Sequence, residues 1–481
     1  MTCRSHFSIR RLRFLLFPLP CLLFLYSLSA AERPNIVFLL ADDLGWGDVG
    51  FHASEIKTPN IDKLAGGGAK LEAFYVQPVC SPTRAALMTG RYPMRHGLQV
   101  GVVRPWAQYG LPLEERTLPQ ALAEAGYFTA ICGKWHLGHF QRAYLPTARG
   151  FLHQYGHYNG ALDYFTHIRD GGFDWHRNDQ VCRDEGYTTV LLGNEAVKLI
   201  EGHDAARPLF LYVPFNAPHS PLQAPQEYLD RYASIEKPQR QKYAAMVSCV
   251  DDQIGRIAAA LEKKGLAKNT LICFSSDNGG PLGSGATNGP LRSGKGTLYE
   301  GGVRVSAFAN FPGTIMAGST VTQPLHMVDW YPTLLKLAGA RLEQKLPLDG
   351  RDAWATITAG AASPHEDILL NTTPANGAIR AGNWKLVLGG SLAETGGEEL
   401  ALGEQAKAKK GKKVKQAAAA AVELFNLADD LNEKTNLAEQ QPARVAELRA
   451  KLEAYAKAAV SPKSAPAAAG FVAPKVWGEK D

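Results

Sequence analysis

From Pro34 onward, short apolar runs alternate with longer segments in which apolar residues recur at helical spacing. Uninterrupted apolar runs of this length predict buried β-strands. They occupy residues 35–40, 127–132, 208–213 and 270–275. Between them, residues 117–125 and 241–264 have the periodicity of amphipathic helices. This alternation predicts an α/β fold in which helices cover both faces of a mostly parallel sheet.

The pattern changes near Ala361. Four short runs separated by turns predict an antiparallel sheet, at residues 367–370, 377–380, 385–388 and 422–427. An amphipathic helix over 442–459 closes this smaller α+β subdomain, predicted for residues 361–460. A lysine- and alanine-rich stretch, 403–421, is predicted to be a solvated insertion, with weak contact to a polyanionic substrate as the alternative. The Ala/Pro-rich tail, 461–481, is predicted to be disordered.

Residues 1–31 are predicted to be a signal peptide. Four arginines precede an apolar run over residues 14–28, and small residues follow it. An uncleaved anchor is the alternative, but the run is short for a membrane span and contains Pro18 and Pro20. We therefore expect a secreted or periplasmic protein with no stable membrane insertion after cleavage.

Composition and charge narrow the function classes. The chain has 481 residues, 45% of them hydrophobic and 20% charged, which is typical of globular proteins. Its net charge of +6 falls to +2 without the four arginines of the signal peptide, and the insertion alone contributes six lysines. No broad basic surface is left, so the sequence does not predict nucleic-acid binding.

Polar residues follow each of the four predicted strands. In chain order they are Asp42 and Asp43, Lys134 and His136, His219, and Asp277 and Asn278. Ligands in open α/β sheets bind beyond the carboxyl ends of the strands, so we expect these side chains to share one site. The aspartates and the asparagine offer only oxygen ligands, which favours a hard cation such as Ca²⁺ or Mg²⁺ over zinc.

A second motif lies at residues 78–90 (PVCSPTRAALMTG). Pro82 and the helix-forming residues after it place Cys80 at the start of a helix, where free N–H groups attract anions. Arg84 follows four residues later and shares a helix face with Cys80. Together they predict a site for a tetrahedral oxyanion. A cysteine phosphatase loop is excluded, because it needs an arginine where this chain has Ala86.

These residues resemble the type I, formylglycine-dependent sulfatases of the alkaline phosphatase superfamily. Residues 80–84 (CSPTR) match the C-x-P-x-R core of that family. Residues 126–136 (GYFTAICGKWH) match its second motif, except that Cys132 replaces a small or aliphatic residue. The likeness runs from about residue 34 to residue 388 and is greatest to arylsulfatase B-type enzymes, which act on N-acetylgalactosamine 4-sulfate. That closer similarity is carried by residues 133–138, 149–164, 221–228 and 290–302.

The resemblance implies an alkaline phosphatase-like large mixed sheet between helices, in a catalytic domain over residues 32–360. It also implies that a maturation enzyme oxidises Cys80 to formylglycine, whose hydrate attacks sulfur. One Ca²⁺ would be held by this group together with Asp42, Asp43, Asp277 and Asn278.

The remaining catalytic roles are also implied by the resemblance. Arg84 and Lys134 would stabilise the hydrate and the sulfate. His219 and Lys295 would bind the sulfate and protonate the departing sugar oxygen. His136 would take a proton from the second hydroxyl of the hydrate and so release sulfate.

The expected activity is hydrolysis of sulfate esters on a sulfated carbohydrate, such as a glycosaminoglycan. Substrate contacts are expected from Arg104, Trp106, His153, His157, Asn159 and Arg292. A phosphonate or phosphate ester hydrolase of the same superfamily is the enzymatic alternative. An unmatured, lectin-like glycan binder is the non-enzymatic one, but every mapped catalytic position is filled.

Overall fold

Strand β1 (Asn35–Ala41) lies in the middle of a ten-stranded mixed sheet. The computed structural model describes residues 1–2, 33–374, 376–391 and 421–478. β1 pairs in parallel with β10 (Leu209–Pro214) on one side and β11 (Thr270–Ser276) on the other. β4 (Phe128–Lys134) pairs in parallel with β10, and β5 (His153–His157) with β4. The four predicted strands are therefore adjacent and parallel, as expected.

Shorter strands extend the sheet on both sides. Its order is β13-β2-β12-β11-β1-β10-β4-β5-β8-β9. The added strands are β2 (Ala69–Leu71), β12 (Ala307–Asn310), β13 (Ser319–Val321), β8 (His176–Arg177) and β9 (Gln180–Val181). Because β12 and β8 run antiparallel to their inner neighbours, the sheet is mixed.

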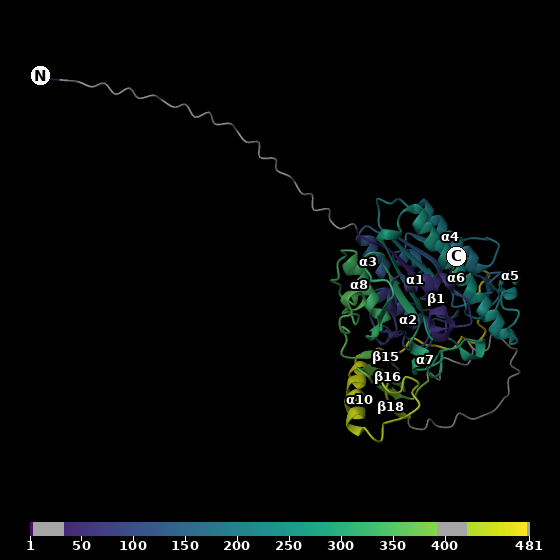
Figure 1. Cartoon of the computed structure of the whole chain (residues 1–481). Helices are drawn as coiled ribbons and strands as arrows, with labels where there is room; N and C mark the ends of the chain where they lie inside the picture. Colours follow the sequence, from purple (N-terminus) through teal and green to yellow (C-terminus); the bar gives the residue numbers. More distant parts are fainter. Residues whose placement is uncertain (3–32, 375, 392–420, 479–481) are drawn as a thin grey trace. The chain divides into compact units, whose positions relative to one another are not determined.

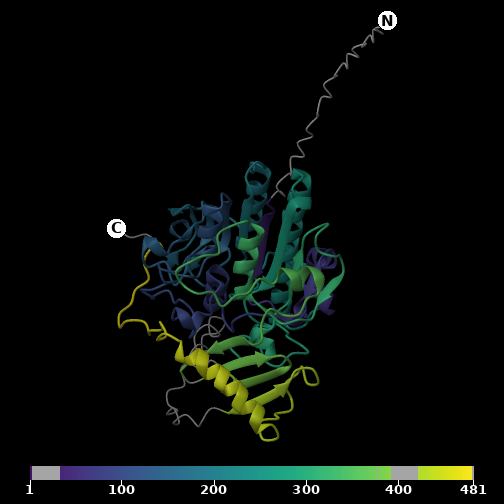
Figure 2. The same ribbon diagram turned by 90° about the vertical axis from the view of Figure 1, so that its left-hand side faces the viewer.

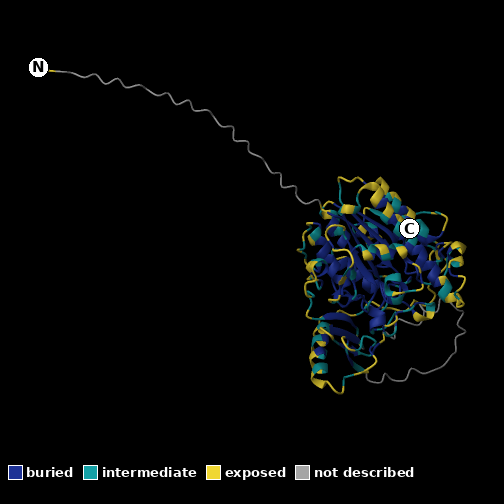
Figure 3. Cartoon of the chain, in the orientation of Figure 1, coloured by how far each residue is buried: buried dark blue, intermediate teal, exposed yellow. Residues whose placement is uncertain are grey.

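Helices cover both faces of this sheet (Figure 1). Alternate residues of β1 face opposite layers, as expected for a strand buried on both sides. Phe38 packs in the core that includes α2 (Cys80–Thr89), α3 (Leu118–Glu124) and α8 (Trp330–Leu337). Val37 and Leu39 pack in the core that includes α1 (Pro59–Gly66), α4 (Thr188–Gly202) and α6 (Pro238–Lys264). The interior between these helical layers is buried (Figure 3), which confirms the predicted α/β fold.

A second, four-stranded antiparallel sheet follows in the chain (Figure 2). It consists of β15 (Ile368–Thr372), β16 (Gly377–Ala381), β17 (Trp384–Leu388) and β18 (Val422–Asn426). Helix α10 (Pro442–Lys457) buries Leu448 and Leu452 against it. The other strands and α-helices of the described residues are β3 (Phe74–Tyr75), β6 (Ile168–Arg169), β7 (Gly172–Phe173), β14 (Leu325–His326), α5 (Gln226–Asp230), α7 (Glu300–Val303) and α9 (Trp354–Ala359).

The described residues from Arg33 onward belong to one compact unit. The division of that unit at residue 360 stays a prediction. Nearly all of the predicted signal peptide, and all of the insertion at 403–421 except Ala421, lie outside the described residues. In the described part of the chain, no helix is both long enough and apolar enough to cross a membrane.

The tail after Ser461 differs from the prediction of disorder. Its described residues, up to Gly478, make hydrogen bonds to distant loops. Trp477 is only 3% exposed, and its indole N–H donates to the Arg169 carbonyl at 2.8 Å. The prediction followed from the Ala/Pro-rich composition and did not take account of two aromatic residues. These are Phe471 and Trp477, which supply the apolar contacts that order this segment.

Candidate active site

The site lies at the carboxyl ends of the central parallel strands. Asp42 and Asp43 follow β1, Lys134 ends β4, and Asp277 follows β11 directly. Because these strands are neighbours and run in the same direction, their ends deliver side chains to one edge of the sheet. The three aspartates and Lys134 are at most 2% exposed, so each buried charge needs a partner of opposite sign.

Oxygen atoms converge beside Cys80. Ligand atoms of Asp42, Asp43, Cys80 and His219 all lie within 4.8 Å of one another. Asn278 donates from Nδ2 to Asp43 Oδ1 at 2.7 Å. Its Oδ1 is buried and has no hydrogen-bond partner among the described residues. An unsatisfied buried oxygen beside carboxylates fits a hard divalent cation, so these residues could hold one.

Three cationic side chains alternate with the three aspartates. Lys134 Nζ lies 2.6 Å from Asp42 Oδ2. The other two pairs are Lys295 with Asp43, at 2.8 Å, and Arg84 with Asp277, at 2.7 Å. These six formal charges cancel, so a bound divalent cation would leave the site net positive. A net positive, buried site favours an anionic substrate.

Cys80 is the first residue of α2 and is fully buried. Its Sγ lies 3.5 Å from Asp42 Oδ1 and 3.6 Å from Lys295 Nζ. Burial, with the charge of Asp277 next, raises the pKa of the thiol well above its usual value. The thiol itself is therefore disfavoured as the nucleophile. Its position at a helix N-terminus between two lysines and an arginine nevertheless suits a reacting anion.

Arg84 joins two parts of the site. Its Nη2 and Nε donate to Asp277 Oδ2 at 2.7 and 3.1 Å, and its Nη1 donates to the Lys134 carbonyl at 2.9 Å. Burial opposes the charge of Arg84, but the nearby acidic groups, Asp277 first among them, together outweigh burial and raise the guanidinium pKa. Burial likewise opposes the charge of Lys134, and Asp42 with the other acidic groups around it raises its pKa overall. Both side chains therefore stay cationic.

His136 is held by contacts from several segments. Its backbone has φ 58°, in the left-handed region, and its N–H donates to the Tyr158 carbonyl at 3.0 Å. Its carbonyl accepts from Ser81 Oγ at 2.8 Å, and its Nε2 lies 3.1 Å from the Val103 carbonyl. A Cβ at Gly160 would stand 2.4 Å from His136 Cε1, so glycine is required for this close approach.

His219 lies in the loop after β10. Its Nε2 is 3.7 Å from Asp43 Oδ2, and its Nδ1 is 2.6 Å from the Ser220 carbonyl. Tyr164, which is buried, donates its hydroxyl to the carbonyls of His219 and Asn216. The loop is therefore anchored from outside the sheet.

Comparison with known proteins shows which family has this sequence. Residues 34–340 match the family model described as Sulfatase. The chain belongs to the sulfatase family. Arylsulfatase J of Mus musculus is 39% identical over 466 residues, which cover 90% of this chain and 77% of that protein. N-acetylgalactosamine-6-sulfatase of Rattus norvegicus is 36% identical over 372 residues, 72% and 70% of the two chains.

Solved structures agree with this assignment. The crystal structure of Ps i-CgsB in complex with k-i-k-neocarrahexaose has a TM-score of 0.79 and 32% identity, and the match covers 92% of this chain and 95% of that one. The predicted family is thereby confirmed, and the protein is a sulfuric ester hydrolase. The arylsulfatase B-like subtype stays a prediction.

The residues predicted to contact substrate lie in several separate segments of the chain. Arg104 and Trp106 follow Val103, which contacts His136, and both are partly exposed. His153 lies at the start of β5, opposite Ala130 and four residues before the end of the strand, and its Nε2 is 3.0 Å from Glu195. This position does not support a contact with substrate.

Two further candidates are occupied by structural contacts. Asn159 is 1% exposed and donates from Nδ2 and from its backbone N–H to Asp174. His157 is fully buried and stacks on Trp175, and burial lowers its pKa to about 3. Both side chains therefore serve the packing beside His136 in this structure.

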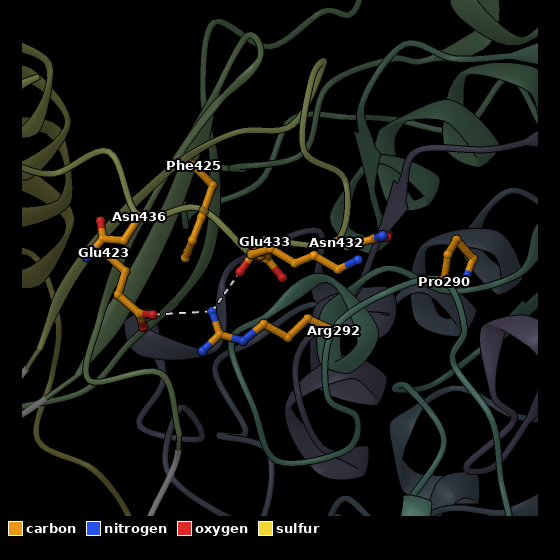
Figure 4. A pocket seen from close by; sticks show the side chains of 8 residues that line it. Pro290, Arg292, Glu423, Phe425, Asn432, Glu433 and Asn436 are labelled. Carbon is orange, nitrogen blue, oxygen red and sulfur yellow. Dashed lines mark hydrogen bonds and ion pairs between the residues drawn. The ribbon is translucent and has the colours of Figure 1, made fainter. Parts of the chain in front are cut away.

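Arg292 lines an open pocket of about 500 Å³ between the loop before α7 and the C-terminal sheet (Figure 4). Its guanidinium carbon lies 3.7 Å from the centre of the Tyr299 ring. Its Nη1 donates to Glu423 Oε1 at 3.2 Å and to the Glu433 carbonyl at 2.9 Å. These contacts tie the loop that carries Lys295 to the C-terminal sheet.

Two residues that position His136 were not predicted from the sequence. Ser81 bridges the His136 carbonyl and the Val103 N–H, and it occupies a variable position of the C-x-P-x-R motif. Asp174 is fully buried and accepts from the N–H groups of Tyr158 and Asn159. Asp174 follows no apolar run or recognisable motif, so no pattern in the chain indicated it.

Proposed function

We propose that this sulfatase removes sulfate from a sulfated carbohydrate, using a formylglycine made from Cys80 and one Ca²⁺. The observation that carries the proposal is the position of Cys80, buried at the start of α2 among alternating carboxylates and cations. Oxidation of Cys80 by a maturation enzyme would supply an aldehyde whose hydrate presents a hydroxyl to sulfur. The phosphonate or phosphate ester alternative is not favoured, because the curated relatives described above are sulfatases.

Ca²⁺ would be held by Asp42, Asp43, Asp277 and Asn278, and it would neutralise charge on the sulfate. Arg84 keeps Asp277 in place through its two donors. Lys134, bound to Asp42 at 2.6 Å, holds positive charge on the same side as the reacting group. These contacts form before substrate arrives, so little reorganisation is needed in the transition state.

Lys295 and His219 would serve the leaving group. Lys295 Nζ lies 3.6 Å from Cys80 Sγ, and His219 Nε2 shares Asp43 as a neighbour with that lysine. Either can bind the sulfate, and either can donate a proton to the sugar oxygen as its bond to sulfur breaks. His136 would then take a proton from the second hydroxyl, which breaks the C–O bond to sulfate and restores the aldehyde.

For the substrate we propose a 4-sulfated N-acetylgalactosamine unit of a glycosaminoglycan. The support is the resemblance noted over residues 149–164 and 290–302 and the names of the relatives, one of which is an N-acetylgalactosamine-6-sulfatase. We further propose that residues 1–31 direct export to the periplasm or the medium.

The test is release of free sulfate from a 4-sulfated N-acetylgalactosamine disaccharide by calcium-loaded protein whose formylglycine content is verified by mass spectrometry. Cys80→Ser should lower the rate about 10³-fold or more, because it removes the nucleophile. Cys249→Ala, which removes a buried thiol from α6, is the matched control and should retain activity.

The outcomes separate the parts of the proposal. No release from fully converted protein would exclude the 4-sulfated substrate, and other sulfated glycans would then decide the carbohydrate class. Faster hydrolysis of a matched phosphate ester than of the sulfate ester would favour the phosphoesterase alternative. Equal rates for wild type and Cys80→Ser would refute the role of Cys80.

A further inference from the structure

The C-terminal segment, defined here as residues 460–478, follows α10 (Figure 2) and contacts loops much earlier in the chain. Its first half runs beside residues 94–106. The Lys463 N–H donates to the Gly97 carbonyl at 2.7 Å. The indole N–H of Trp106 donates to the Ala465 carbonyl at 2.9 Å. A Cβ at Gly97 would stand 3.0 Å from the Ser461 carbonyl oxygen, so the two backbones are in close contact.

The second half of the segment is joined to β7. The Phe173 N–H donates to the Lys475 carbonyl, and the Trp477 N–H donates to the Phe173 carbonyl, each at 2.9 Å. The Trp477 ring is buried beside His139, with their centres 5.3 Å apart. These contacts fix both ends of the segment, so the residues between them are held over the surface rather than free in solvent.

The loop beside the first half, residues 94–106, and a residue beside the second half both touch His136. Val103, in the first loop, has its carbonyl 3.1 Å from His136 Nε2. Tyr158, whose carbonyl accepts from the His136 N–H, packs against Gly478. A Cβ at Gly478 would stand 2.5 Å from Tyr158 Cε2. The C-terminal segment therefore contacts Tyr158, which touches a catalytic side chain, and it also lies beside the loop that carries Val103.

Between its fixed ends, the segment presents an aromatic surface. The Phe471 ring meets the Trp106 ring edge to face, with centres 6.3 Å apart and planes at 66°. Phe471 is 39% exposed and Trp106 is partly exposed. The Arg104 guanidinium carbon lies 5.9 Å from the centre of the Trp106 ring. An apolar ring surface beside a cation suits a pyranose that packs its C–H face on the rings and pairs an acidic group with the guanidinium.

We propose that Trp106 and Phe471, with Arg104 beside them, form an outer sugar subsite, and that the C-terminal segment completes it by supplying Phe471. The subsite would hold the sugar next to the one whose sulfate reacts at Cys80. This inference rests on the proposed function, and it adds a substrate-binding role for a segment outside the matched residues 34–340. It predicts that the segment affects oligosaccharides and not small sulfate esters.

The test compares a sulfated tetrasaccharide with 4-nitrophenyl sulfate, which is too small to reach an outer subsite. Phe471→Ala should lower kcat/KM for the tetrasaccharide about tenfold, equivalent to about 1.4 kcal/mol, mainly through KM. Its kcat/KM for the aryl sulfate should change by less than about twofold. Val472→Ala is the matched control, because Val472 is adjacent and 83% exposed.

A truncation tests the segment as a whole. A chain ending at Ser461 should lose more tetrasaccharide activity than Phe471→Ala, while a chain ending at Gly478 keeps every contact described above. Binding is read separately from chemistry, by the change in tryptophan emission when the tetrasaccharide is added to Cys80→Ser protein with and without Phe471→Ala.

The outcomes distinguish this inference from the function on which it rests. Unchanged tetrasaccharide kinetics and binding in Phe471→Ala would overturn the subsite while leaving the sulfatase activity intact. Equal losses on both substrates would also overturn it, since they would show that the segment only supports His136. A fully converted wild type that releases sulfate from neither substrate would refute the proposed substrate, and the subsite with it.

Discussion

Replacing Lys385 with methionine should destabilise the protein strongly. Lys385 Nζ lies 2.9 Å from Glu300 Oε1 and 2.8 Å from Glu433 Oε1, and the three side chains are at most 1% exposed. Glu433 also accepts from the Glu300 N–H, at the start of α7. The cluster joins the C-terminal sheet to the segment that follows Lys295. Methionine has nearly the same length but no charge, so the variant leaves two buried carboxylates without this cation.

The magnitude follows from the burial of the cluster. Removing one partner of a buried ion pair costs about 3–5 kcal/mol, a large share of the ~5–15 kcal/mol that stabilises a typical domain. Glu300 keeps Arg304 as a neighbour, at 3.4 Å, so the larger effect falls on Glu433. Burial already raises the pKa of Glu433 to about 7, against the opposing effect of Lys385. Without Lys385 this pKa rises further.

The pH dependence of the variant has a definite sign. A carboxyl group whose pKa is higher in the folded state binds its proton more tightly there, so stability falls as pH rises above the unfolded value. The loss of stability in Lys385→Met should therefore be greater at pH 8 than at pH 6. Adding Glu433→Gln should recover part of the stability at pH 8, because the amide oxygen still accepts from the Glu300 N–H.

The assay is urea unfolding followed by tryptophan fluorescence at both pH values. Lys336→Met is the matched control, since that lysine is 66% exposed and makes a surface ion pair with Asp352 at 2.6 Å. We expect the control to lose less than about 1 kcal/mol. A loss of that size in Lys385→Met, or a loss independent of pH, would refute the reasoning about this cluster.

Two further predictions concern the metal and acid stability. Ca²⁺ at about 100 times its dissociation constant should stabilise the wild type by about 2.7 kcal/mol. Asn278→Ala should require a higher calcium concentration for the same stabilisation. A melting temperature that neither calcium nor a chelator changes would exclude the site. Burial lowers the pKa of His96 and of His326 to about 3. As the pH falls, these histidines are therefore protonated in the unfolded chain before they are protonated in the folded protein. The free energy of unfolding should then decrease as pH drops below about 6.5. Replacing either histidine with glutamine should reduce that pH slope in urea titrations, and an unchanged slope would contradict the assignment.

The sequence was sufficient for features that depend on local pattern. Each apolar run became a central strand, because strands buried on both faces need uninterrupted apolar residues. The polar residues after those runs met at one edge, since neighbouring parallel strands end at the same side of a sheet. Cys80 and Arg84 were likewise found from their spacing in one helix.

Tertiary structure alone decided the features that depend on contacts between distant segments. The C-terminal segment is ordered by Trp477 and Phe471, whose partners lie more than 300 residues earlier in the chain. His153 was a reasonable candidate by motif, but its register in β5 places it at the opposite end of the strand from the site. The Lys385 cluster and Asp174 follow no periodic pattern. Charged groups are buried in pairs drawn from separate parts of the chain, and only folding brings such pairs together.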